Sequence, residues 1–187
     1  MCTMATTPLK HLQKLLESLA DDDHYLFDLD DLAPAFPGMS RPALKMLLAR
    51  AVADGLFEHP CRGVYLYPRA SYPRGLVLYH IAAKLRANTL AYISLESALS
   101  DAGVISQMPL QWLTIMTGGR SATITCGRFG TIEYIHTTRS PEQLAPQLIF
   151  DERCRLWRAS VPLSLQDMKR CRRPLDLIDW SVADEFA

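Results

Sequence analysis

The sequence predicts an α+β protein with a helical N-terminal unit that closes on a small hairpin and a C-terminal unit built around a β-sheet. Leucines and alanines recur at helical spacing early in the chain, whereas Thr, Ile and aromatic residues dominate several short segments beyond residue 110. Between these regions, residues 67–75 (YPRASYPRG) are rich in proline and arginine, a composition typical of a linker. We therefore expect two domains, residues 1–70 and residues 76–187.

The N-terminal unit begins with a leucine-rich segment for which Thr7 can serve as the N-cap. The acidic run 21–23 ends this helix as a solvated turn. A short extended piece at 25–27 follows, and then a short helix capped by Asp28 or Asp30. We expect these elements to form a compact helical unit.

A third helix is predicted in SRPALKMLLARAVADG, where Ser40 is a good N-cap and Gly55 supplies a left-handed stop. Its apolar stripe is Leu44, Leu47, Leu48, Ala51 and Val52. Beyond the helix, LFEHP and GVYLYP alternate like two strands around the turn at residues 61–63.

The C-terminal unit opens with two predicted helices, LVLYHIAAKLRA and SLESALSDAGV; Ser94 is the expected cap of the second and Gly103 its stop. The sequence then changes to strand-like segments, LQWLTIMT, SATITCG, TIEYIHTT and CRLWRASV, with glycine-containing turns between the first three. SLQDMKRC and RPLDLIDWSVADEF are predicted to close the chain as helices. We expect a mixed α/β domain with an antiparallel sheet.

The composition places few limits on function. The chain has 20 basic and 20 acidic residues, so any nucleic-acid surface must be local. Its five cysteines are widely spaced, which argues against a disulfide framework or a zinc site and for a reducing compartment. The N-terminus lacks the apolar core of a signal peptide, and no segment approaches the roughly 20 apolar residues of a membrane span. We expect a soluble cytoplasmic protein.

The order helix, short helix, capped helix and basic-tipped hairpin is that of a winged helix-turn-helix, whose third helix enters the DNA major groove. In the third helix, the side opposite the leucines carries small and basic residues, and the hairpin tip carries an arginine placed for a phosphate or the minor groove. The expected DNA-binding residues are Ser40, Arg41, Lys45, Met46, Ala49, Arg50 and Arg62.

Other interpretations of this surface stay open. Three basic residues on an exposed helix face can be a solvated surface alone, and winged-helix units also dock proteins. The first seventy residues carry seven basic and nine acidic residues, a net charge of −2 that counts against nucleic acid. These acids, however, cluster in the segments that precede the third helix.

The chain as a whole resembles the AbiEi antitoxins of type IV toxin–antitoxin and phage-abortive-infection operons. The resemblance lies in DGLFEHPCRGVYLYP, LAYISLESALSDAGVI and ASVPLSLQDMKR, set around a β-rich block. It implies that the N-terminal winged helix binds promoter DNA with inverted repeats and represses its own operon. It also implies that the C-terminal domain counters a nucleotidyltransferase-type toxin without a stable complex, as a monomer or weak dimer.

The C-terminal region carries 13 basic and 11 acidic residues after residue 70, a net charge of +2. A second surface for DNA or RNA is one interpretation of this excess, and a solubilised sheet face is the other. In CRLWRA we expect Arg153, Arg155 and Trp157 on one strand face, with Leu156 and Arg158 on the other. The expected antitoxin surface is Arg153, Arg155, Arg158, Lys169, Arg170, Arg172 and Arg173.

No segment predicts an enzyme, a metal site or a cofactor. TGGRS lacks the phosphate-loop pattern and fits a hairpin turn, and Ser94 with Glu96 fits a helix cap. His59 and Cys61 have no second ligand pair nearby, and His80 fits a partly buried helix position. Two alternatives to an antitoxin remain: a winged-helix regulator whose C-terminal domain senses a ligand or protein, and an interaction adaptor that does not bind DNA.

Overall fold

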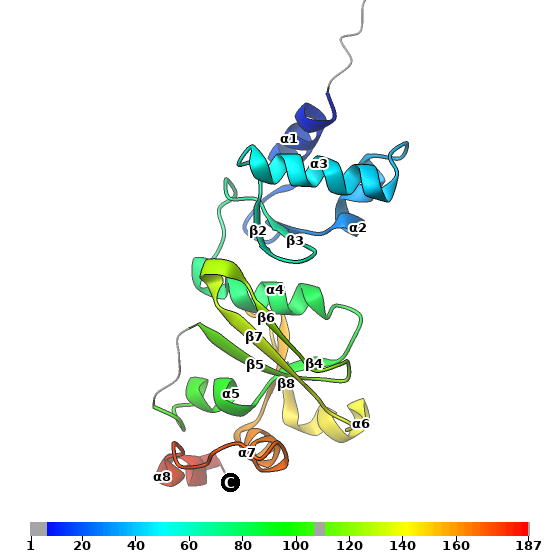
Figure 1. Cartoon of the computed structure of the whole chain (residues 1–187). Helices are drawn as coiled ribbons and strands as arrows, with labels where there is room; N and C mark the ends of the chain where they lie inside the picture. Colours follow the sequence, from blue (N-terminus) through cyan, green and yellow to red (C-terminus); the bar gives the residue numbers. More distant parts are fainter. Residues whose placement is uncertain (1–6, 107–110, 187) are drawn as a thin grey trace, which may run out of the picture. The chain divides into compact units, whose positions relative to one another are not determined.

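The computed structural model describes residues 7–106 and 111–186, and it confirms a mixed α+β protein with two sheets (Figure 1). The chain divides into two compact units, Met1–Gly75 and Leu76–Ala187.

Within residues 7–75, the first unit contains three α-helices and a three-stranded antiparallel sheet with the strand order β1-β3-β2. Its elements are α1 (Pro8–Leu19), β1 (Leu26–Phe27), α2 (Leu29–Leu32), α3 (Arg41–Ala53), β2 (Glu58–Cys61) and β3 (Val64–Leu66).

The helices of this unit begin where the sequence predicts, because each is preceded by a side chain that accepts its first free N–H groups. Thr7 caps α1, and Ser40 caps α3 by accepting from the N–H of Ala43. At α2 the cap is the side chain of Asp28, and the carboxylate of Asp31 in turn accepts from the backbone N–H of Asp28. The apolar stripes of α1 and α3 meet in one core, which includes Leu12, Leu16, Leu44, Leu47, Leu48 and Ala51.

The second unit is built on a six-stranded sheet with the order β6-β7-β5-β4-β9-β8. Its strands are β4 (Ala91–Ile93), β5 (Trp112–Thr117), β6 (Ala122–Thr125), β7 (Thr131–His136), β8 (Leu148–Asp151) and β9 (Leu156–Ala159). Its helices are α4 (Val77–Leu85), α5 (Leu95–Asp101), α6 (Pro141–Leu144), α7 (Val161–Arg170) and α8 (Trp180–Ala183).

Helices cover both faces of this sheet, with α4 on one side and α5 and α7 on the other (Figure 1). On the α4 side, the hydroxyl of Tyr134 in β7 donates to the carbonyl of Ala82 at 2.9 Å. On the opposite side a buried cluster joins the sheet to both helices, and it includes Tyr92, Leu99, Met116, Leu163 and Met168.

The prediction of an antiparallel sheet is wrong, because β4 pairs with β9 and β5 with β7 in parallel. The other pairs are antiparallel. Strand β6 follows β5 in the chain but does not pair with it; it lies at the sheet edge and pairs with β7. Strand β7 therefore lies between β6 and β5 and runs parallel to β5.

Three local predictions for the second unit also need correction. Residues 152–155 form a turn rather than the start of a strand, and β8 and β4 were not expected as strands. The predicted closing helix is reduced to α8 and a 3-10 turn at Asp184–Phe186. Its first half is not helical, because Pro174 cannot donate to a helix and Ile178 forms a β-bridge with Ile105.

Candidate nucleic-acid interface

Helix α3 presents one buried and one exposed face. Leu44, Leu47, Leu48 and Ala51 are buried, so the opposite positions face solvent. Lys45, Ala49 and Arg50 are exposed, and the side chain of Met46 is 60% exposed although it is apolar. This face therefore combines two cations with small and flexible apolar groups.

Arg41, at the first position of α3, already has a partner. Its Nη1 lies 2.6 Å from Oδ1 of Asp30 in α2, and both side chains are more than half exposed. The hydrogen bond from Arg41 lowers the pKa of the Asp30 carboxyl, and the same bond raises the pKa of Arg41. Because an exposed pair of this kind contributes little stability, a phosphate or a base edge can compete with Asp30 for the guanidinium.

Arg62 lies at the tip of the β2–β3 hairpin. Cys61 and Val64 pair across the turn, which leaves Arg62 and Gly63 as the two connecting residues, and Arg62 is exposed. Gly63 has a φ of +86°, a conformation that glycine adopts without strain. The tight turn therefore projects the guanidinium away from the core.

Several acids of the first unit have defined roles in turns, in a helix cap or in an ion pair. Oδ1 of Asp21 accepts the N–H groups of residues 23 and 24, and the bond from His24 lowers the pKa of Asp21. Asp28 and Asp31 form the capping box of α2, and Asp30 holds Arg41. One further acid, the exposed Asp54, follows α3 as its C-cap, one turn beyond Arg50.

The basic residues expected to form one surface in the second unit are instead dispersed. Arg153 and Arg155 lie in the turn between β8 and β9, and not on a strand face; Arg155 has a φ of +57°. The carbonyl of Arg153 is 2.7 Å from Nε2 of His80, a buried residue of α4.

Arg158 takes part in a partly exposed cluster of charges. Its guanidinium bonds to Asp101 and also to Asp151, at 2.9 Å. Burial lowers the pKa of Arg158, but the bonds to the two carboxylates outweigh it and raise the pKa overall. Burial also raises the pKa of the neighbouring Cys154 thiol to about 11, which favours the protonated thiol near neutral pH.

The four remaining residues of the predicted surface lie on or just beyond α7 and differ in their contacts. Arg173 bonds to Glu133 at 2.6 Å, with Glu96 at 3.5 Å from its Nε. Lys169 lies 6.0 Å from the centre of the Trp180 ring. Arg172 is exposed, and Arg170 donates to the hydroxyl of Thr138 at 2.6 Å.

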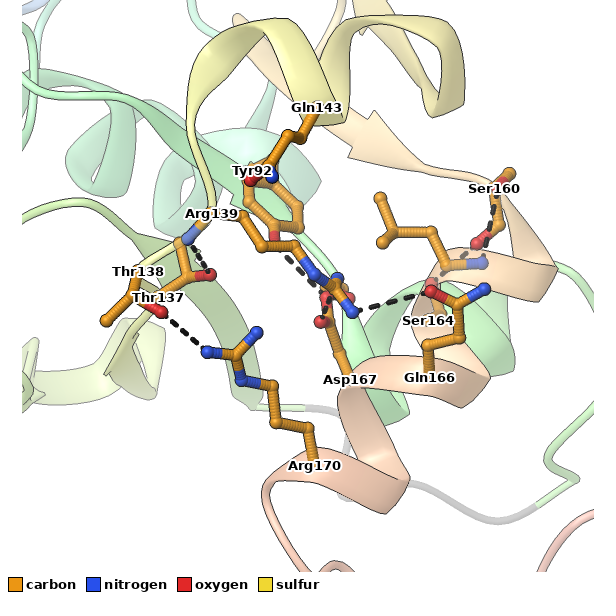
Figure 2. Close-up of polar contacts among 12 residues, drawn as sticks. Tyr92, Thr137, Thr138, Arg139, Gln143, Ser160, Ser164, Gln166, Asp167 and Arg170 are labelled. Carbon is orange, nitrogen blue, oxygen red and sulfur yellow. Dashed lines mark hydrogen bonds and ion pairs between the residues drawn. The ribbon is translucent and has the colours of Figure 1, made fainter.

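The sequence did not reveal a polar network beneath Arg170 (Figure 2). Asp167 of α7 is fully buried and accepts from the Tyr92 hydroxyl at 3.1 Å, the Ser94 hydroxyl at 2.8 Å and Nη1 of Arg139 at 2.7 Å. Burial, followed by the charge of Asp167, raises the pKa of Tyr92. Ser94 occupies the predicted cap position of α5, but its hydroxyl makes this bond instead of a cap bond. The one sequence signal was an acid among Leu163, Ser164 and Met168 on the buried face of a helix.

Comparison with known proteins adds no assignment: no family model matches the chain, and no curated protein matches it significantly. Among residues 7–106 and 111–186, no three His, Cys, Asp or Glu side chains are grouped to hold a metal ion. In the same part of the chain, no helix has the length and apolar character needed to cross a membrane.

Proposed function

We propose that residues 1–75 form a winged helix-turn-helix that binds double-stranded DNA, and that the chain is an AbiEi-type antitoxin that represses its own operon. The observation that carries the DNA-binding proposal is the exposed face of α3, where Lys45 and Arg50 flank the small side chain of Ala49. Small residues let a helix backbone approach the groove, while cations on either side neutralise phosphates.

The order of the elements supports the same proposal. α1, β1, α2, α3, β2 and β3 follow one another as in a winged helix, with the β2–β3 hairpin in the position of the wing. On this basis α3 is the recognition helix and Arg62 contacts the flanking phosphates. Arg41, released from Asp30, reaches a base edge from the N-terminal end of α3.

The antitoxin part of the proposal rests on the resemblance of the chain to the AbiEi antitoxins. The second unit then opposes a nucleotidyltransferase-type toxin encoded beside it, without a stable complex between the two. The dispersed arginines do not form one continuous basic face, so we assign this role to the unit as a whole rather than to a single patch.

Two experiments test the two halves of the proposal. The full chain should bind a labelled DNA fragment from upstream of its own gene more tightly than an unrelated fragment of equal length, with an affinity that falls as salt rises. Equal affinity for the two fragments would contradict an autorepressor. Co-expression with the adjacent gene should restore growth if that gene encodes the toxin, and unchanged toxicity would exclude the antitoxin role.

A further inference from the structure

A cavity of about 490 Å³ lies in the second unit between α7, α6 with the turn that follows it, and the segment after β7. Leu163 forms part of its wall, and the other lining side chains are polar. These are Thr138, Arg139, Gln143, Gln147, Gln166 and Arg170. The lining thus includes two guanidinium groups and no carboxylate, which selects against cations and against apolar ligands.

Hydrogen bonds orient two of the lining amides as donors. The side-chain oxygen of Gln143 accepts from the N–H of Ser140 at 3.0 Å. The side-chain oxygen of Gln166 accepts from Nη2 of Arg139 at 3.4 Å (Figure 2). Since both oxygens are engaged within the protein, the two NH₂ groups remain to donate to a ligand.

The two guanidinium groups are held in different ways. Arg139 is anchored by the buried carboxylate of Asp167, which balances its charge and fixes its position. Arg170 bonds to the neutral hydroxyl of Thr138, and no carboxylate among the described residues pairs with it. The cavity therefore keeps one positive charge without a carboxylate partner beside the N–H donors of the two amides.

We propose that this cavity binds a phosphate-bearing polar small molecule of about the size of a mononucleotide. Its volume lies within the range of small-molecule sites, and guanidinium groups with amide donors match the acceptor oxygens of a phosphate. Arg170 contacts the phosphate, and the amides of Gln143 and Gln166 bind its remaining oxygens or a neighbouring hydroxyl. The inference does not depend on DNA binding by the first unit.

The test measures binding of inorganic phosphate and of adenosine monophosphate to the full chain by calorimetry. Arg170→Gln removes the uncompensated charge from an exposed side chain, and Arg172→Gln removes the same charge from an exposed position outside the cavity. We expect Arg170→Gln to weaken binding at least about tenfold and Arg172→Gln to change it less than about twofold. Tryptophan fluorescence verifies that both variants are folded.

Equal weakening by the two substitutions would overturn the proposal, because it would indicate a general charge effect. The proposal would also be overturned if neither inorganic phosphate nor adenosine monophosphate bound at about 10 mM. Random-sequence duplex DNA and RNA are titrated in parallel. If Arg170→Gln weakens the binding of DNA or RNA while neither small probe binds, the cavity contacts a polymer backbone and the small-molecule assignment is wrong.

Discussion

Replacing Asp167 with Asn should destabilise the second unit by about 3 kcal/mol. Removing one member of a buried ion pair costs about 3–5 kcal/mol, because the remaining charge stays uncompensated. Asp167 is fully buried, but the side chain of Arg139 is 18% exposed and lines a cavity, so water can solvate part of its charge. We therefore place the loss at the lower end of the range. Tyr92→Phe removes one bond to the same carboxylate and should cost about 1.5 kcal/mol.

Urea unfolding followed by tryptophan fluorescence measures this loss selectively, since all three tryptophans, at positions 112, 157 and 180, lie beyond residue 75. Asp176→Asn makes the same chemical change at an exposed position and should shift the free energy of unfolding by less than about 0.5 kcal/mol. If Asp167→Asn cost no more than this control, Asp167 would not be the charged anchor of the network.

Three further results are expected. Leu48→Ala, at a fully buried position of α3, should destabilise the first unit by about 2–5 kcal/mol in urea unfolding followed by circular dichroism; a loss below about 1 kcal/mol would contradict its place in the core. Asp30→Asn frees Arg41 and should tighten DNA binding by about two- to fivefold in fluorescence anisotropy, while Asp22→Asn should not, and equal effects would point to net charge alone. Burial raises the pKa of Tyr79 from 10.0 to about 12, so the folded state retains a proton that the unfolded chain loses near pH 10. The free energy of unfolding should consequently fall between pH 10 and pH 12, and Tyr79→Phe should reduce this fall; an identical fall in the variant would exclude Tyr79 as a cause.

Local signals predicted the first unit well. Helix α3 follows from apolar residues at helical spacing between Ser40 and Gly55, and both ends are fixed by neighbouring residues. The β2–β3 hairpin follows from two short alternating runs around residues 61–63. Such elements depend on residues close in the chain, which a single sequence displays directly.

The sheet of the second unit depends on contacts between distant segments, and there the prediction failed. Strand β4 pairs with β9, more than sixty residues later, and nothing in either short run specifies a parallel partner. In CRLWRA, the predicted strand is present as β9 from Leu156 onwards, but its first two residues belong to a turn that ends at the left-handed Arg155.

The two candidate sites also differ in whether the sequence could predict them. The exposed face of α3 could be deduced from the positions of its buried leucines, since one helix carries both faces. The cavity beside Arg170 could not be deduced, because it joins Thr138 and Arg139 to α7 across 28 residues or more. An acid on the buried face of α7 signals only that some cation lies nearby.

The central claim is that α3 binds DNA, and the salt dependence of binding tests it most directly. Lys45→Gln with Arg50→Gln removes two cations from the exposed face of α3, whereas Lys10→Gln with Lys14→Gln removes two exposed cations from α1. The slope of log K against log salt should become shallower by about 1.8 for the α3 pair, if each cation neutralises one phosphate, and should not change for the α1 pair. An α3 pair that stays folded and keeps the wild-type slope and affinity for the upstream DNA would contradict the claim.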